Sequence, residues 1–205
     1  MAVIPRLSAS MSSTHGQSLG NHLTSAHDDR EGFDARFCID DDPNTFCHTR
    51  VEGTEGTTGT GTYPWLSIQI PGSTFHPLDI VVSHVVILNR HDCCRDRLSP
   101  FQIWVGQAAG DYNSSTSNEC GTFGWGKHDD LSVPNSVGPF TFDCHGLVGW
   151  YVTIVLPGVN RILNLGEVRL YSDFHSPSHP PPPPPVGAED GLALSEAILR
   201  REEAE

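Results

Sequence analysis

Hydrophobic and polar side chains alternate in five short runs between Pro64 and Ser172. The positions of one phase are Leu66, Ile68 and Ile70; Ile80, Val82, His84, Val86 and Leu88; Phe101, Ile103 and Val105; Trp150, Val152, Ile154 and Leu156; and Val168 and Leu170. A period of two places every second side chain on the same face of an extended chain. Each run therefore predicts one half-buried β-strand.

Turn-forming residues separate these runs, for example at positions 71–73, 106–110, 134–136 and 157–158. No helical stretch long enough for a crossover between parallel strands lies among them. The pattern predicts an all-β fold, an antiparallel β-sandwich of the jelly-roll type. The polar, glycine-rich stretch from Gln17 to Thr62 predicts long loops.

The C-terminal part of the chain has a different composition. Residues 173–186 include six consecutive prolines, Pro180 to Pro185, and predict an extended linker. Residues 187–205 form a charged tail with a few apolar positions, which predicts a short helix too weak to be stable alone. The predicted folded domain is therefore residues 8–172.

Charge argues against two classes of partner. The formal net charge is −13, from 25 acidic and 12 basic residues, so long-range attraction to nucleic acid or to anionic membranes is disfavoured. No run approaches the roughly 20 apolar residues of a membrane-spanning helix, so no membrane insertion is expected. Arg90, Arg95 and Arg97 nevertheless fall within eight residues and make a local cationic spot.

The six cysteines include no Cys-x-x-Cys spacing and favour three disulfides over a zinc site. Disulfides imply an oxidising compartment, and we expect an extracellular or cell-surface protein. The first ten residues contain no secretory hydrophobic region, so we expect this chain to be a fragment of a longer protein.

The densest cluster of charged residues and cysteines, Asn89 to Leu98, directly follows the predicted strand 80–88. A guanidinium presents five donors in a rigid fork, so arginines held by Asp92 or Asp96 can bind neighbouring hydroxyl groups directionally. Cys93 and Cys94 can bond to each other or to distant cysteines. Bonded to each other, they form a compact apolar ring suited to packing against a sugar face.

Arg90-x-Asp92 is followed by Arg97, with Cys93-Cys94 between them and His48 upstream. This arrangement resembles the signature of the F-type lectin (fucolectin) family. Four further segments support the resemblance: 8–13 is similar to the family's opening strand, 39–41 to its Ile-Asp-Gly loop, 64–65 to the Pro-Trp that opens its next core strand, and 166–168 to its closing Cys-Glu-Val. The resemblance covers residues 8–172. With 41 residues between them, His48 and Arg90 lie farther apart in sequence than the family usually has.

The resemblance implies a galactose-binding-domain-like sandwich related to coagulation factor 5/8 C-type (discoidin-like) domains, with long loops at the ligand end. It implies a shallow site for fucose, formed by His48, Arg90, Asp92, Cys93, Cys94 and Arg97. It also implies a structural Ca²⁺ held by Phe37, Asp40, Asp42, Thr45, Gly166 and Glu167, which matches the oxygen ligands that Ca²⁺ prefers.

The resemblance also guides the disulfide pairing. Gly166 stands where the family has its closing cysteine, so the usual partner of Cys47 is missing while an additional Cys38 is present. We therefore expect Cys38–Cys47 and Cys93–Cys94, with Cys120 and Cys144 left for each other.

We expect a lectin that binds terminal L-fucose or a similar fucosylated glycan reversibly, because no catalytic motif or activated nucleophile is present. A shallow site binds weakly, so oligomers or tandem modules are expected to supply avidity. Two alternatives remain open at this stage. One is a discoidin-like module for lipid headgroups or a protein partner, and the other is the glycan-targeting module of a larger enzyme.

Overall fold

The computed structural model describes residues 1–15, 33–53, 63–72, 80–120 and 131–173, and these residues form two antiparallel β-sheets. The first sheet has the order β1-β10-β5-β8, and β3 also pairs with β10. Its strands are β1 (Ala2–Val3), β3 (Cys47–His48), β5 (Val81–Asn89), β8 (Phe140–Val148) and β10 (Asn164–Ser172).

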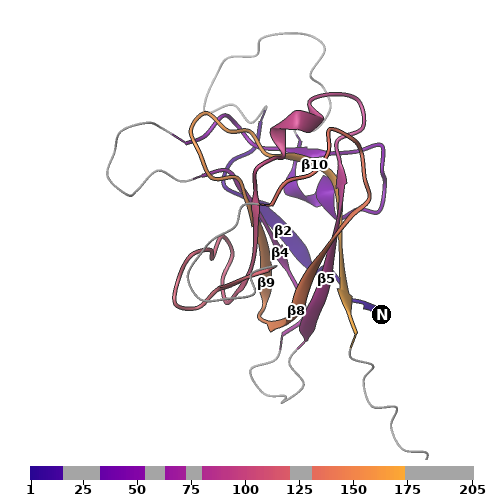
Figure 1. The fold of residues 1–205 in the computed structure, drawn as a ribbon, viewed down its shortest axis with the longest axis vertical. Coiled ribbons are helices and arrows are strands. Elements are labelled where there is room, and N and C mark those ends of the chain that lie inside the picture. The colour runs from indigo at the N-terminus through magenta and orange to yellow at the C-terminus, as the bar shows by residue number, and fades with distance from the viewer. Residues whose placement is uncertain (16–32, 54–62, 73–79, 121–130, 174–205) are drawn as a thin grey trace, which may run out of the picture. The chain divides into compact units, whose positions relative to one another are not determined.

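The second sheet has the order β2-β4-β9-β6-β7. Its strands are β2 (Ser8–Met11), β4 (Trp65–Gln69), β6 (Gln102–Gly106), β7 (Asn118–Glu119) and β9 (Tyr151–Val155). Two 3-10 turns, η1 (Ala35–Cys38) and η2 (Arg95–Arg97), are the helical elements among the described residues. Figure 1 shows β2, β4 and β9 in one layer and β5, β8 and β10 in the other.

The core lies between the two sheets and confirms most of the predicted inward positions. Side chains with no more than 1% exposure include Leu66, Ile68 and Ile70, Phe101, Ile103 and Val105, Val152, Ile154 and Leu156, and Val168 and Leu170. The alternating pattern thus predicts these strands correctly, because one face of each is covered by the opposite sheet. The predicted all-β antiparallel sandwich is confirmed.

In β5 the predicted phase holds only at the start of the strand. A register shift between Val82 and His84 moves the buried series to Val85 and Ile87, which are fully buried. Val86 and Leu88, predicted to share the inner face, are only half-buried. A β-bulge opposes two residues to one and so reverses the alternation beyond it.

All three expected disulfides are present: Cys38–Cys47, Cys93–Cys94 and Cys120–Cys144. Cys120 follows β7 in the second sheet, whereas Cys144 belongs to β8 in the first. This bridge therefore ties the two sheets together.

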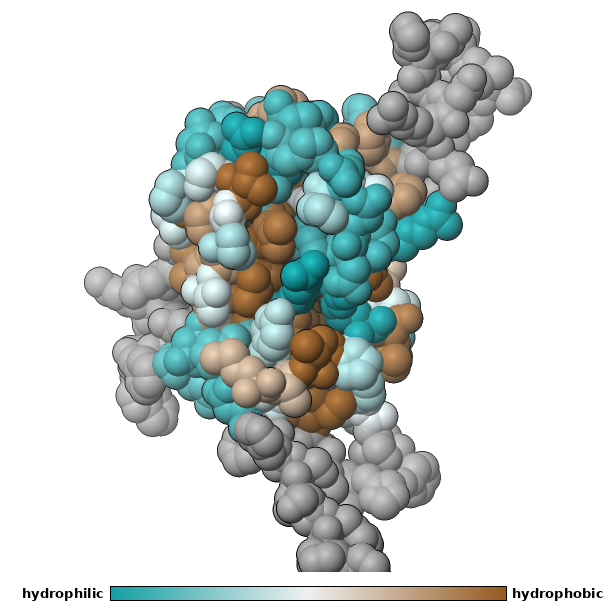
Figure 2. All heavy atoms as spheres, turned by 90° about the vertical axis from the view of Figure 1, so that its right-hand side faces the viewer, coloured by the Kyte–Doolittle hydropathy of each residue, from teal (hydrophilic) through white to brown (hydrophobic). Residues whose placement is uncertain are grey.

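Some predictions fall outside the described residues. These are positions 17–32 and 54–62 of the polar, glycine-rich stretch, the proline-rich linker beyond Asp173 and the charged tail 187–205. Within the described part of the chain, no helix has both the length and the apolar character needed to cross a bilayer. The face shown in Figure 2 is mainly hydrophilic, with hydrophobic side chains gathered left of centre in its upper half and again near its lower end.

Candidate functional site

Three strands meet where the motif residues lie. β10 pairs with β3 on one side, with Asn164 opposite His48, and with β5 on the other, with Leu165 opposite Asn89. His48 at the end of β3 and Arg90 just after β5 therefore flank the same end of β10. Sheet topology brings together residues that are separated by 41 others in the chain.

The Arg90 guanidinium is held on two sides. Its Nε and Nη2 donate to the two carboxylate oxygens of Asp92, at 2.5 and 2.9 Å. Its Cζ lies 3.7 Å from the centre of the Phe46 ring, in cation–π geometry. The pKa of Asp92 is lowered to about 2, mainly by the hydrogen bonds from Arg90. Asp92 is thus ionised at neutral pH and fixes the direction of the Arg90 fork.

His48 offers an acceptor rather than a charge. Its side chain is 6% exposed, and burial is the main cause that lowers its pKa to about 4. Nδ1 donates to the Thr49 carbonyl at 2.6 Å, because a carbonyl can only accept. In the neutral ring Nε2 is therefore an acceptor, and Nη1 of Arg97 lies 3.5 Å from it.

Aromatic rings surround both Arg90 and His48. Phe33 stacks on Phe46 with 4.8 Å between ring centres and lies 5.7 Å from the His48 ring. The ring of His15 lies 4.7 Å from that of His48. These rings are not among the site residues predicted from the sequence, although the phenylalanine adjoining Cys47-His48 was an available signal.

The loop between β5 and β6 carries the other motif residues and is braced from both ends. Asn89 accepts from the backbone N–H of Arg90 at 2.8 Å and donates to the Arg95 carbonyl at 2.9 Å. The Arg161 guanidinium donates to the carbonyls of Arg97 and Pro100, at 3.0 and 2.9 Å. Sequence reasoning missed both braces because their partners are backbone atoms that only the fold brings near.

Arg95 and Arg97, the other two arginines of the loop, have different roles. Arg95 donates to the backbone carbonyls of Arg90, at 3.2 Å, and of His91. It therefore shapes the loop, whereas Arg97 contacts His48. Of the two acids considered as holders, Asp92 binds Arg90, and the Asp96 side chain makes no hydrogen bond or ion pair with the described residues.

The chemical character of this cluster follows from its parts. Arg90 and Arg97 supply only donors, and neutral His48 supplies an acceptor. The half-buried Cys93–Cys94 disulfide adds a small apolar surface between the two arginines in sequence. Donors, an acceptor and an apolar patch together suit a ligand with several hydroxyl groups and one apolar face.

Four of the six residues expected to bind Ca²⁺ meet around one hydroxyl. Thr45 Oγ1 lies 3.0 and 2.8 Å from the Asp40 carboxylate oxygens, 3.0 Å from the Asp42 carbonyl and 3.3 Å from the Phe37 carbonyl. All are hard oxygen donors, and they fit a Ca²⁺ ligand set. No group of three or more His, Cys, Asp or Glu side chains in the described residues is arranged for a metal, so backbone carbonyls would supply much of this set.

Glu167 lies beside the same loop. Its carboxylate is 1% exposed, accepts from the Asp41 N–H at 3.1 Å and pairs with Arg6. Burial raises the pKa of Glu167 to about 7, and the positive charge of Arg6 acts in the opposite direction. A nearby divalent cation would favour the ionised carboxylate. For Gly166, the sixth expected ligand, the structure shows that it adjoins Glu167 in β10.

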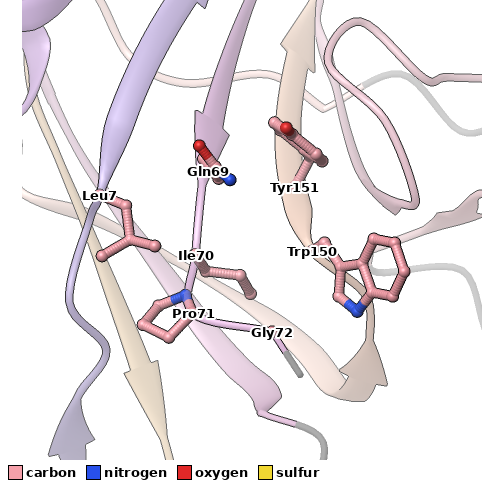
Figure 3. A pocket seen from close by; sticks show the side chains of 7 residues that line it. All are labelled: Leu7, Gln69, Ile70, Pro71, Gly72, Trp150 and Tyr151. Atoms are coloured by element: carbon pink, nitrogen blue, oxygen red, sulfur yellow. The ribbon is translucent and has the colours of Figure 1, made fainter. Parts of the chain in front are cut away.

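A separate hollow of about 300 Å³ lies at the opposite end of the sandwich. Its lining residues are Leu7, Gln69, Ile70, Pro71, Gly72, Trp150 and Tyr151 (Figure 3). Trp150 follows Val148, which pairs with Val81 at the start of β5, whereas the motif residues follow the end of β5. The lining carries no charged side chain, so the polar cluster and this hollow are distinct.

Comparison with known proteins finds similarity in sequence and in fold. No protein-family model matches the sequence. A pentraxin fusion protein of Xenopus laevis is 28% identical over 128 residues, covering 62% of this chain and 25% of that protein. The chain therefore matches about a quarter of the length of that relative.

Two solved structures show the likeness in three dimensions. A fucolectin from striped bass (Morone saxatilis) serum has a TM-score of 0.55 at 23% identity, over 80% of this chain and 45% of that one. A carbohydrate-binding module of Clostridium perfringens, in complex with GalNAc-β-1,3-galactose, has a TM-score of 0.55 at 15% identity, over 83% of this chain and 100% of that one. The resemblance found in the sequence extends to the fold: this chain has an antiparallel β-sandwich similar to those of the striped bass fucolectin and the Clostridium perfringens module.

Proposed function

We propose that this chain is a lectin that binds terminal L-fucose, or a glycan with similarly placed hydroxyl groups, reversibly and without covalent chemistry. The observation that carries the proposal is the convergence of the Arg97 guanidinium and the acceptor Nε2 of His48, 3.5 Å apart, beside the fixed fork of Arg90. The names of the similar structures, a fucolectin and a sugar-bound module, support the same class of ligand.

The proposed binding mode uses each group for what its chemistry allows. Arg90 and Arg97 donate to hydroxyl or ring oxygens, and His48 Nε2 accepts from one hydroxyl. The Cys93–Cys94 ring covers an apolar patch of the sugar. Because the Arg90 fork is held by Asp92 and Phe46 in the free protein, little conformational freedom is lost on binding.

We further propose that Ca²⁺ supports the site by ordering the loop from Phe37 to Thr45. Asp40 and Glu167 would bind through their carboxylates, and Phe37, Asp42, Thr45 and Gly166 through carbonyls. The oxygen cluster around Thr45 and the buried Glu167 carboxylate support this proposal. The ion would supply positive charge and loop order, with no part in chemistry on the sugar.

The three disulfides are typical of an oxidising compartment, so the proposed setting is extracellular or at the cell surface. There the weak single site would act through several copies, in oligomers or tandem modules, on fucosylated glycans.

Isothermal titration of the full chain with L-fucose tests the proposal, alongside an array of glycans that includes galactose-terminated ones. Arg97→Met keeps the apolar stem and removes the fork, so it should abolish measurable L-fucose binding. Failure of the parent protein to bind any glycan would refute the lectin assignment. Binding confined to galactose-terminated glycans would retain the lectin and reject the preference for fucose.

A further inference from the structure

Asn164, the first residue of β10, is a buried amide without a partner. Its side chain is 1% exposed, and neither its nitrogen nor its oxygen has a hydrogen-bond partner. Among the described residues, no other buried side chain leaves two polar atoms unpaired. Asn89 is equally buried at 1%, but both of its amide atoms are bonded. Because buried amides are almost always satisfied, Asn164 requires an explanation.

The position of Asn164 relates it to the proposed sugar site. It lies directly opposite His48, while Leu165 lies opposite both Cys47 and Asn89. Alternation then places Asn164 and His48 on the same face of the sheet. The register, continued by one residue, sets Arg90 on the other side of Asn164. The three residues thus form a row across β3, β10 and the end of β5.

The electrostatics agree with this row. The positive charges of Arg90 and Arg97 both contribute to lowering the pKa of His48, so both guanidinium groups lie near the imidazole. Side chains directly opposite in an antiparallel pair have Cβ atoms about 5 Å apart. The unpaired amide therefore lies near the His48 side chain and, in the register, between His48 and Arg90.

We propose that Asn164 is a further ligand-contacting residue, whose amide hydrogen-bonds to a hydroxyl group of the bound sugar, directly or through one water. This inference rests on the proposed lectin function. An amide both donates and accepts, as a hydroxyl group does, whereas Arg90 and Arg97 only donate and neutral His48 Nε2 only accepts. Asn164 would thus select the position of one hydroxyl group that the other three residues do not fully satisfy.

The test replaces Asn164 by leucine, which has a similar size and no polar atoms, in the full chain. L-fucose affinity, measured by isothermal titration, should fall by about 3- to 10-fold, the usual range for one net hydrogen bond. The melting temperature should stay the same or rise, because the change removes an unpaired buried amide. The matched variant Asn89→Leu removes a satisfied amide of equal burial and should lower the melting temperature.

Monodeoxy derivatives of L-fucose at C2, C3 and C4 separate direct recognition from a structural effect. For one derivative, the loss on deleting the hydroxyl and the loss in Asn164→Leu should not add, because both remove the same interaction. Unchanged L-fucose affinity in Asn164→Leu would overturn the inference while leaving the lectin function intact. A parallel loss of stability and affinity, with additive losses for all three derivatives, would also overturn it. If the parent protein binds no sugar, the lectin function itself fails.

Discussion

Replacing Asp92 by asparagine tests whether the fixed direction of Arg90 matters for binding. Asparagine keeps the size of the residue and can still accept from the Cys93 N–H, which Asp92 does at 2.8 Å. It removes the charge that holds two guanidinium nitrogens at 2.5 and 2.9 Å. Contact with Phe46 at 3.7 Å would remain, so Arg90 loses one of its two restraints.

The two consequences differ in size. The Asp92 side chain is 44% exposed, so solvent screens the ion pair and its contribution to stability is no more than about 1 kcal/mol. That corresponds to a fall in melting temperature of about 2–4 °C for a domain of this size. Ordering a released arginine side chain on binding costs about 0.5–1.5 kcal/mol, which weakens L-fucose affinity by about 2- to 12-fold.

Isothermal titration and thermal melting of the same samples separate these effects. Asp96→Asn is the matched control, because it removes an equal charge from the same loop while the Asp96 side chain has no partner among the described residues. Its affinity should remain close to that of the parent. Equal affinity of Asp92→Asn and the parent, or an equal fall in both variants, would refute the restraint of Arg90 by Asp92.

Three further predictions follow from the same geometry. Millimolar Ca²⁺ should raise the melting temperature relative to EDTA even without sugar, because a ligand bound only by the folded state stabilises it, and Asp40→Asn should abolish the response. At a Ca²⁺ concentration that saturates the loop, L-fucose affinity should be constant from pH 8 to 5 and fall towards pH 4, because protonation of His48, with its pKa near 4, replaces the Nε2 acceptor by a donor; a fall centred near pH 6.5 would contradict the buried neutral ring. Peptide mapping without reduction should find Cys93 and Cys94 in one peptide, and mild reductant should open this half-buried bridge before the buried ones and weaken sugar binding before unfolding; simultaneous loss of binding and fold would contradict this order.

Periodicity predicted the buried strands well where only one phase of the pattern was apolar. Residues 66–70 are of this kind, with Ser67 and Gln69 in the other phase, and their predicted inner positions are buried. In β5 both phases are rich in valine, isoleucine and leucine, so the sequence carries no mark of the bulge between Val82 and His84. The predicted runs did not include β8, Phe140–Val148, although Phe140, Phe142 and Cys144 alternate with polar residues there.

Resemblance to a known motif identified the groups that can face a ligand, because those groups recur at defined spacings. It did not identify Phe46, Asn89, Arg161 or Asn164 as parts of the candidate site. Phe46 and Arg161 act on residues far away in sequence or on backbone carbonyls, and Asn164 reaches the site only through the pairing of β10 with β3. Such roles depend on which strands are neighbours, and one sequence does not specify that.

The start of β10 links the two proposed binding functions of the chain. Asn164 lies beside His48, and Glu167, three residues later, contacts the loop expected to hold Ca²⁺. The Cys38–Cys47 disulfide joins the turn at the start of that loop to the residue before His48, and Cys38 Sγ lies 3.2 Å from the Leu165 carbonyl. We expect order in this loop to reach the imidazole through the covalent bridge and one strand pairing. The proposed Ca²⁺ would then support sugar binding without contacting the sugar.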